Sequence, residues 1–492
     1  MPTSRSCLAS GHRSISEDHA RYVLLTKRYR GALWFLCDIV AAMQPRKPAL
    51  GFIFITLVLD VLGFGLLIPV SPLLVESLLH HGSGGTASEA APVVSALGST
   101  FYAMSFLFAP ALGVLSDRVG RRPVILISLF GSGIDYLAMA ISPTLSWLFV
   151  TRVINGISGA SFSAASAYVA DVTPPEKRAA GFGLIGAAFG LGFVIGPLIG
   201  GYLGSPASHI PFIGHGSIRF PFYFAGIITL INWLYGFFFL PESLPPERRR
   251  PFQLRRANPV GAFYSLAKYP LVLGMAIYLF LVNMAQFALH VTWVLSMEHR
   301  FGWGPFRNAL SLTLVGIGSA VVQGGLARRL VPILGEKHSL MFGIIVGVCA
   351  YIGYGAATHG WIIYAIICIA SLGAISVPAG QALVSKEVLP TEQGTIQGAI
   401  ASLVSLAGII GPMIGGWTFA YFTQEPPPFR DSPIPLAGAN FYVSAILTVL
   451  GGFAAAWAMR HHIERPGGRQ SPKQALDSAI PASPAVVGPI QK

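Results

Sequence analysis

Long apolar runs separated by short polar or basic segments occupy the chain between residues 50 and 460. The apolar residues are continuous and do not alternate with polar ones, which is typical of membrane-spanning helices and not of barrel strands. A helix crosses roughly 30 Å of hydrocarbon with about 20 residues. At that length the pattern predicts twelve spans, near 50–76, 94–114, 123–142, 146–170, 179–203, 220–240, 270–297, 308–329, 339–357, 361–384, 394–421 and 438–459.

The composition supports an integral membrane protein. Of the 492 residues, 53% are hydrophobic and only 11% are charged, whereas a soluble domain carries about 25% charged residues. Too few charges are present to cover a water-facing surface of this size. We therefore predict an all-α membrane protein.

The net charge of +13 indicates orientation in the membrane and not nucleic-acid binding, because the basic residues lie in short loops between apolar runs. One set of loops is rich in Lys and Arg, and the alternate set is poor. The rich set is expected to be cytoplasmic, which places both termini inside and requires an even number of spans. The rich set holds Arg46, Lys47, Arg118, Arg121, Arg122, Lys177, Arg178, Arg248–Arg250, Arg255, Arg256, Arg328, Arg329, Lys337, Lys386 and Arg460; the poor set holds Arg219, Arg300, Arg307 and Arg430.

The segments outside the spans have their own composition. Residues 1–48 form an extension that we expect to be cytoplasmic and partly disordered, with Met43 rather than Met1 as the hypothetical native start. No small-residue cleavage site follows its apolar piece, so it does not resemble a signal peptide. We expect a six-helix bundle at 49–240, a basic linker at 241–269, a second bundle at 270–460 and a disordered cytoplasmic tail at 461–492.

The four cysteines, Cys7, Cys37, Cys349 and Cys368, lack metal-ligand spacing, so we predict neither a disulfide nor a metal site. No Walker motif, phosphate loop or nucleophile elbow is present in the sequence, so ATP as the energy source and enzymatic activity are not expected. We expect no cofactor.

A repeated glycine–proline block indicates two related halves. The fifth span contains Gly192, Gly196-Pro197 and Gly200-Gly201, and the eleventh contains Gly411-Pro412 followed by Gly415-Gly416. Glycines four residues apart allow another backbone to approach closely, and proline bends a membrane helix. A generic packing seam is the alternative. The repetition favours a transporter with its site between the halves, near the midplane.

These segments resemble the major facilitator superfamily and, within it, the drug:proton antiporters that include tetracycline efflux proteins. The resemblance covers roughly residues 48–460. It rests on LDVLGFGLLIPVSP (59–72), GVLSDRVGRR (113–122), RVINGISGASFSAASAYVAD (152–171), FGLGFVIGPLIGG (189–201) and several shorter segments. It implies two pseudo-symmetric six-helix halves that rock between inward-open and outward-open states while protons enter and a substrate leaves.

Charges inside the spans are functional candidates, because each costs at least about 2.5–3.5 kcal/mol in the hydrocarbon. Asp60, Asp135 and Arg152 lie in the first, third and fourth predicted spans. We expect Asp60 to bind a proton and Asp135 either to share that role or to contact a cationic substrate, with Arg152 pairing with one of the two carboxylates in one state. A static ion pair that only fixes helix packing is the alternative.

A second charged group is expected to control the gate. The resemblance implies that Asp117 lies near a helix N-terminus of the other half, with Arg118, Arg121 and Arg122 beside it. Asp171 and Arg178 would complete the cluster, and its opening would open the cytoplasmic side. The alternative is charge that only sets topology.

The sequence departs from the tetracycline pumps at two positions. Ser319 and Gly347 stand where those proteins carry a histidine and an aspartate, and neither can carry a proton. His290, whose ordinary pKa is near 6.5, is a candidate replacement, although a lone histidine on an apolar helix is more often structural. Gln286, Asn283, Trp293, Tyr102 and Gln381 are candidate cavity residues because amide and aromatic groups suit an amphipathic ligand.

The sequence therefore predicts a proton-coupled exporter of amphipathic small molecules, tetracycline-like or other drugs, in a bacterial inner membrane. Its partners would be the substrate, protons and lipid, without nucleic acid, and the protein would be a monomer. The alternatives are an importer or exchanger of a metabolite and, from a different class, a membrane sensor or enzyme on the same scaffold.

Overall fold

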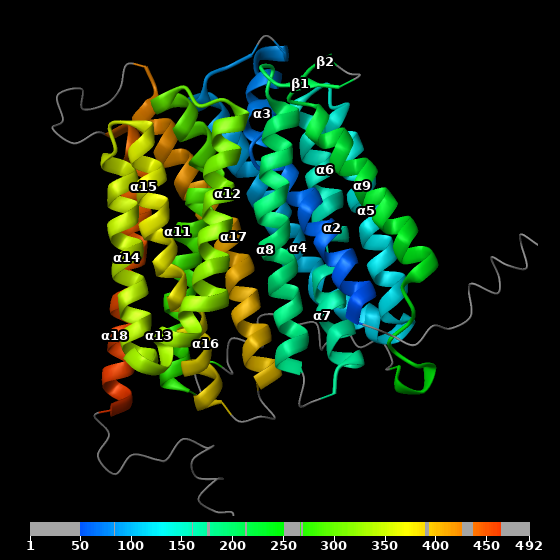
Figure 1. Cartoon of the computed structure of the whole chain (residues 1–492), viewed down its shortest axis with the longest axis vertical. Helices are drawn as coiled ribbons and strands as arrows, with labels where there is room; N and C mark the ends of the chain where they lie inside the picture. The colour runs from blue at the N-terminus through cyan, green and yellow to red at the C-terminus, as the bar shows by residue number, and fades with distance from the viewer. Residues whose placement is uncertain are drawn as a thin grey trace, which may run out of the picture.

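The computed structural model describes residues 50–82, 84–159, 161–174, 178–211, 214–249, 266, 269–388, 393–425 and 436–463. The expectations for the N-terminal extension, most of the linker and the C-terminal tail lie outside these residues. Figure 1 shows long helices running side by side along one axis. In the described residues, eleven helical segments are long and apolar enough to cross a membrane.

The first half of the bundle is built from the segments before residue 240. Its long helices each hold a continuous apolar run, and turns with glycine or proline separate them. They are α2 (Leu50–Leu67), α3 (Ser71–Leu78), α4 (Ala87–Val119), α5 (Arg121–Ala140), α6 (Leu145–Ser158), α7 (Ser161–Val172), α8 (Arg178–Gly204) and α9 (Phe220–Phe239).

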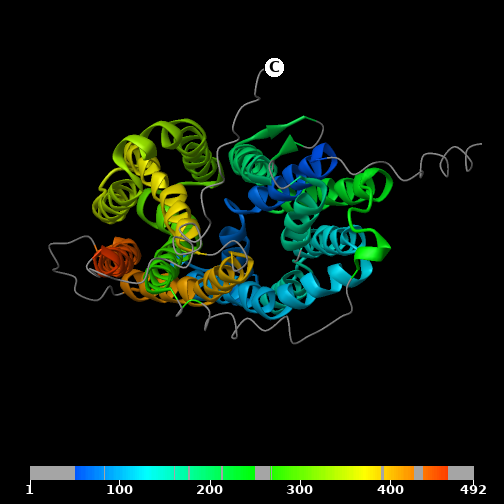
Figure 2. The ribbon, with the colours of Figure 1, turned by 90° about the horizontal axis from the view of Figure 1, so that it is seen from below.

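The second half follows the linker and repeats the pattern. It comprises α11 (Pro270–Phe301), α12 (Pro305–Val321), the π-helical segment η5 (Val322–Leu326), α13 (Ala327–Leu334), α14 (Glu336–Ala356), α15 (Gly360–Ala370), α16 (Ser376–Glu387), α17 (Gln393–Thr423) and α18 (Ala439–Ile463). Viewed along the helix axes, the two halves form two separate groups of helices (Figure 2). The predicted two-half membrane fold is confirmed.

The predicted fourth span is not one straight helix. It is divided between α6 and α7, and each piece is shorter than a membrane span. Gly159 stands at the break, at the end of α6. The ninth span is also interrupted, by the 3-10 segment η6 (Ser371–Ile375) between α15 and α16. Both interruptions fall near Gly and Ser residues, which have lower helix propensity than Ala or Leu.

Two ends of the bundle are distinguished by their residues. The end with a two-stranded hairpin, β1 (His209–Ile210) and β2 (Gly214–His215), is called the hairpin end and lies at the top of Figure 1. The opposite end, called the basic end, carries the N-termini of α5, α8 and α14 and the C-termini of α16 and α18. Its basic residues include Arg118, Arg121, Arg122, Arg329, Lys337, Lys386 and Arg460.

Glycines bring the helices of each half together. An added Cβ at Gly200 would meet the backbone of Leu66 in α2, and one at Gly415 would meet Ala288 in α11. These helix pairs, α2 with α8 and α11 with α17, are among the most extensively packed in the molecule. Close backbone approach of this kind is the known use of small residues between membrane helices.

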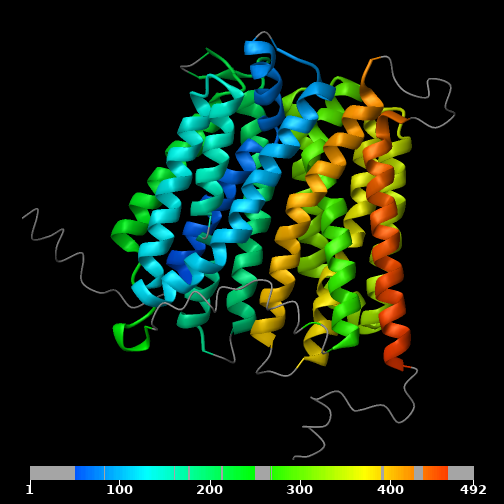
Figure 3. The same ribbon diagram turned by 180° about the vertical axis from the view of Figure 1, so that it is seen from behind.

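The outer surfaces of the helices remain apolar. Ile127, Trp361 and Phe453 are 67%, 70% and 68% exposed, and all three lie on predicted spans. Exposed large apolar side chains around a bundle suit contact with lipid tails, because lipid cannot hydrogen-bond polar groups. Figure 3 shows the same bundle of long helices from behind.

Candidate transport site

A cavity of about 570 Å³ lies between the two halves. Aromatic rings form much of its wall, and a few polar groups are set among them. Its lining includes Phe64, Phe101, Tyr102, Tyr136, Arg152, Asn155 and Phe193 from the first half, and Gln286, Phe287, His290, Trp293, Ser319, Gly347, Tyr351 and Tyr354 from the second. A largely apolar pocket with a small number of oriented polar groups is typical of small-molecule sites.

The halves touch each other toward the hairpin end. Ser99 in α4 donates to the carbonyl of Ile409 in α17 at 2.6 Å, and Thr313 in α12 donates to the carbonyl of Val194 in α8 at 3.1 Å. A Cβ at Gly201 would clash with Ala309, and one at Gly416 would clash with Ser95. The last glycine of each repeated block, Gly201 or Gly416, therefore contacts the opposite half.

Toward the basic end the same helices are less constrained. A Cβ added at Gly190 in α8, Gly398 in α17 or Gly324 after α12 would meet no other heavy atom within 4 Å. The cavity lining also extends to Gln323 and Gly343, each about one turn nearer the basic end than Ser319 and Gly347. The described contacts between the halves thus close the cavity on the hairpin side.

An ion pair lies in the wall of the cavity. Asp135 is 3% exposed, and its Oδ2 accepts hydrogen bonds from Arg152 at 2.5 Å and from Asn155 Nδ2 at 2.6 Å. Burying a carboxylate without a cation is very costly, so the guanidinium and the amide account for its tolerance here. The structure therefore brings together the predicted Asp135 and Arg152, and adds Asn155, which the sequence reasoning did not single out.

Asp60 approaches the same region from α2. Tyr136, which lines the cavity, interacts electrostatically with both Asp60 and Asp135. A Cβ on Gly63, one turn after Asp60, would meet Tyr136 and Thr229. The two predicted proton-binding carboxylates thus flank one buried tyrosine.

His290 lies on the opposite wall, in a short polar chain. Its Nε2 is 2.8 Å from Nε2 of Gln286, and Gln286 Oε1 accepts a hydrogen bond from Tyr351 at 3.2 Å. Phe287, between them on α11, packs against Tyr102 of α4 with ring centroids 4.7 Å apart. The candidate residues Tyr102, Gln286 and His290 therefore meet at the cavity, from both halves.

The remaining candidates are placed differently. Trp293 lines the cavity, but its indole N–H donates to Ser311 at 3.0 Å. Asn283 donates to the carbonyl of Leu279 at 2.7 Å, within its own helix. Asn283 and Gln381 are not among the lining residues, whereas Ser319 and Gly347 are.

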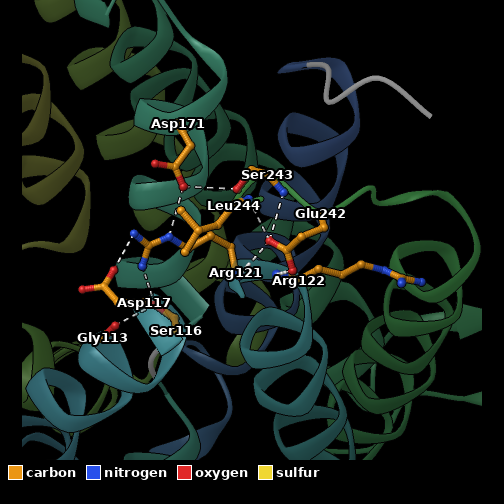
Figure 4. Close-up of polar contacts among 9 residues, drawn as sticks. All are labelled: Gly113, Ser116, Asp117, Arg121, Arg122, Asp171, Glu242, Ser243 and Leu244. Atoms are coloured by element: carbon orange, nitrogen blue, oxygen red, sulfur yellow. Dashed lines mark hydrogen bonds and ion pairs between the residues drawn. The ribbon is translucent and has the colours of Figure 1, made fainter. Parts of the chain in front are cut away.

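The charged loop between α4 and α5 forms a network at the basic end (Figure 4). Arg121 contacts Asp117 at 2.6 Å and Asp171 at 3.1 Å, and it donates to Ser116 at 2.6 Å. Ser243 donates to the same Asp171 oxygen at 3.2 Å. Arg121 therefore joins the end of α4 to the end of α7.

The residues predicted for the gate do not all join this network. Arg118 is exposed, and Arg122 turns to the carbonyl of Phe237 in α9. The side chain of Arg178 and those of the first turn of α17 lie outside the described residues, so the expected contact of Asp117 with a helix N-terminus of the other half stays a prediction.

Glu242 was missed by the charge analysis of the sequence. Its carboxylate accepts the backbone N–H of Arg121 at 2.9 Å and that of Arg122 at 3.3 Å, at the start of α5. A carboxylate is favoured there by the unpaired N–H groups and the helix dipole. The signal was its position directly after the sixth span in Leu-Pro-Glu-Ser, at residues 240–243.

The comparisons with known proteins agree with this architecture. A sequence profile described as Major Facilitator Superfamily matches residues 53–412. The chain belongs to the major facilitator superfamily. It is a membrane transporter and not an enzyme.

Among curated relatives, the class C tetracycline resistance protein of Escherichia coli is 38% identical over 359 residues, covering 73% of this chain and 86% of that protein. The class B protein of Escherichia coli is 31% identical over 389 residues, covering 79% and 92%. The predicted resemblance to tetracycline efflux proteins is confirmed.

Solved structures share the fold. The human organic anion transporter MFSD10 superposes with a TM-score of 0.61 at 27% identity, covering 82% of this chain and 98% of that one. A bacterial homolog of the lysosomal transporter Spinster gives a TM-score of 0.66 at 18% identity, covering 86% and 98%.

Proposed function

We propose that this protein is a proton-coupled exporter of amphipathic small molecules that works by alternating access. The observation that carries the proposal is the buried Asp135–Arg152 pair in the wall of an aromatic cavity between the two halves. A carboxylate in the hydrocarbon region can exchange its cation for a proton, and such groups commonly mark proton pathways. The relatives named for tetracycline resistance support an export direction.

The basic end is the cytoplasmic end in this proposal, following the rule that short cytoplasmic loops are rich in Lys and Arg. The described contacts at the hairpin end then correspond to an inward-facing state of a protein in the bacterial inner membrane. In the transport cycle, protonation of Asp60 or Asp135 weakens the attraction that holds Arg152. Arg152 then reorients, and the halves rock.

The substrate is proposed from the cavity. Its tyrosines and phenylalanines offer ring faces, and Gln286, His290 and Asn155 offer hydrogen bonds. A planar or polycyclic molecule with several polar substituents meets both requirements. Tetracyclines satisfy this description, although Ser319 and Gly347 leave the second half without the carboxylate and imidazole of the tetracycline pumps.

The proposal is tested in two settings. A susceptibility panel in an efflux-deficient host should show raised resistance with the parent protein and its loss with Asp60→Asn at equal expression. Inverted membrane vesicles with an imposed pH gradient then give the direction. Accumulation of the identified compound inside acidified vesicles supports export, whereas proton-independent exchange or movement in the opposite direction would favour the importer or exchanger.

A further inference from the structure

A carboxyl pair joins the two halves at the hairpin end. Glu76 lies in α3 of the first half, Glu298 lies near the end of α11 in the second, and their carboxyl groups are within hydrogen-bonding reach of each other. The helices themselves pack together. Leu73 of α3 belongs to an apolar cluster of the second half that includes Trp293 and Met297.

The surroundings of the carboxyl pair are poor in compensating groups. Glu76 Oε1 and Glu298 Oε2 are buried, and neither receives a hydrogen bond from an N–H or O–H group of the described residues. Two ionised carboxylates within hydrogen-bonding reach would repel each other. A buried acceptor that lacks a donor also costs free energy. A single proton on either carboxyl supplies the missing donor and removes the repulsion.

The other charged groups on the neighbouring elements are engaged elsewhere or lie farther along the chain. On η1 (Leu79–Gly82) and α4, His80 contacts Glu89 at 3.3 Å. On α11, Arg300 donates to three carbonyls at the C-terminal end of α14, and His299 packs on Phe419. Apart from the phenol of Tyr421, whose ring packs against Phe422, the described part of α17 carries no ionisable side chain before Glu425. Burial and Glu298 together raise the pKa of Glu76, which lies in α3 beyond the end of the membrane-spanning helix α2, to about 8.

We propose that Glu76 and Glu298 share a proton that holds the hairpin end closed, and that loss of this proton favours opening on that side. The proposal rests on the alternating access proposed above, because the pair spans the interface that must separate. In the open state the two carboxyls face water and are ionised at neutral pH. A proton arriving from the outer side therefore closes that side behind the released substrate.

The sign of the pH dependence follows from linkage. The proton binds the closed state more tightly than the open state. Its contribution to closure is therefore complete below the ordinary glutamate pKa and declines as pH rises toward about 8.

The test measures a distance across the hairpin end in the full chain in lipid nanodiscs. Spin labels are placed at Ala207→Cys and Thr358→Cys, two exposed positions in different halves, after Cys7, Cys37, Cys349 and Cys368 are replaced by serine. Between pH 6 and pH 9 the ratio of closed to open molecules should fall by about tenfold or more. With Glu298→Gln, or with Glu76→Gln, the closed distance should persist at pH 9.

Glu89→Gln is the matched control, because Glu89 is an exposed carboxylate at the same end that contacts residues of its own half only. It should keep the pH response of the parent. The proposal is overturned if the parent distance does not respond to pH, or if both glutamine variants respond as the parent does. Gly201→Val, which wedges the same interface apart, should open it at every pH; its failure to do so would count against alternating access itself.

Discussion

Asp135 illustrates how much one residue depends on its partners in this protein. Its side chain is fully buried, and its charge is balanced by Arg152, which is itself only 17% exposed. The removal of one member of such a pair leaves an uncompensated charge, whereas removal of both leaves a neutral site. The pair is therefore best examined by a double-mutant cycle.

Arg152→Ala should lower the free energy of unfolding by about 3–5 kcal/mol, because it leaves the buried Asp135 carboxylate without its cation. The double variant Asp135→Asn/Arg152→Ala should recover part of that loss, because the asparagine needs no cation. Thermal unfolding in detergent measures both. Strictly additive losses in the double variant would show that the two side chains act independently.

Gly120 is a second residue whose role depends on its neighbours. Its φ is +112°, and a Cβ would overlap the Glu242 carboxylate that accepts the first N–H groups of α5. Gly120→Ala should therefore cost about 1–3 kcal/mol through the displaced hydrogen bonds, in addition to backbone strain.

Gly113→Ala provides the control for this substitution. Gly113 lies in α4 close to the same loop, and its added Cβ meets nothing within 4 Å. Alanine there should be neutral or stabilise the protein by up to about 1 kcal/mol through helix propensity. Equal melting temperatures for the two variants would contradict the role given to Gly120.

At the scale of the helices, the two glycines of each repeated Gly-Gly pair pack against different neighbours. Gly200 and Gly415 pack against a helix of their own half, whereas Gly201 and Gly416 pack against the opposite half. Adjacent residues on a helix point about 100° apart. One helix can therefore contact its own bundle on one face and the opposite half on the next.

Gly201→Val should shift the molecule toward states that are open at the hairpin end, because the added methyl groups meet Ala309 and the carbonyl of Pro305. Labelling of a cysteine placed in the cavity by a membrane-impermeant reagent, added from the hairpin side, should become faster. Gly190→Val on the same helix, where space is open, should leave the labelling rate at the parent value. Equal labelling rates for Gly201→Val and Gly190→Val would contradict the claim that the contact of Gly201 with the opposite half keeps the hairpin end closed.

The helices were largely predictable from the sequence, and their interruptions were not. Apolar runs of the right length gave the spans because only helices satisfy the backbone in lipid. The break at Gly159 lies within a run that remains apolar and small, so hydropathy carries no sign of it. α3 was merged with the first span for the same reason, although Pro69 and Pro72 lie at its start.

The site was predicted in part for a related reason. Asp60, Asp135, Arg152 and His290 stood out because charges in apolar runs are rare. Glu242, Glu76 and Glu298 lie at helix ends, where acidic residues are ordinary. Only the fold shows that the last two meet across the interface.

At the scale of the whole molecule, the proposed alternating access requires the contacts at the hairpin end to separate. Gly98 in α4 and Pro412 in α17 belong to opposite halves, and a Cβ on Gly98 would lie 3.9 Å from the Cβ of Pro412. That separation is within the range of a disulfide.

The double variant Gly98→Cys/Pro412→Cys, in the background without the native cysteines, should form a cross-link under oxidation and stop transport. Reduction should restore transport to the level of the reduced, unoxidised sample. Each single variant controls for the loss of Pro412 and for oxidation. Full transport by the quantitatively cross-linked protein would exclude rocking about this interface.

Two arginines near the hairpin end fix the internal geometry of each half. Arg219 donates to the carbonyls of Ala140 and Ser142 at the C-terminal end of α5, and Arg300 donates to those of Tyr354, Gly355 and Ala357 at the C-terminal end of α14. Guanidinium groups keep their charge at every pH that a cell membrane experiences. If Glu76 and Glu298 share a proton as proposed, acidification alters how the two bundles meet without loosening either bundle, so that a chemical signal is converted into rigid-body displacement and is not dissipated as local melting.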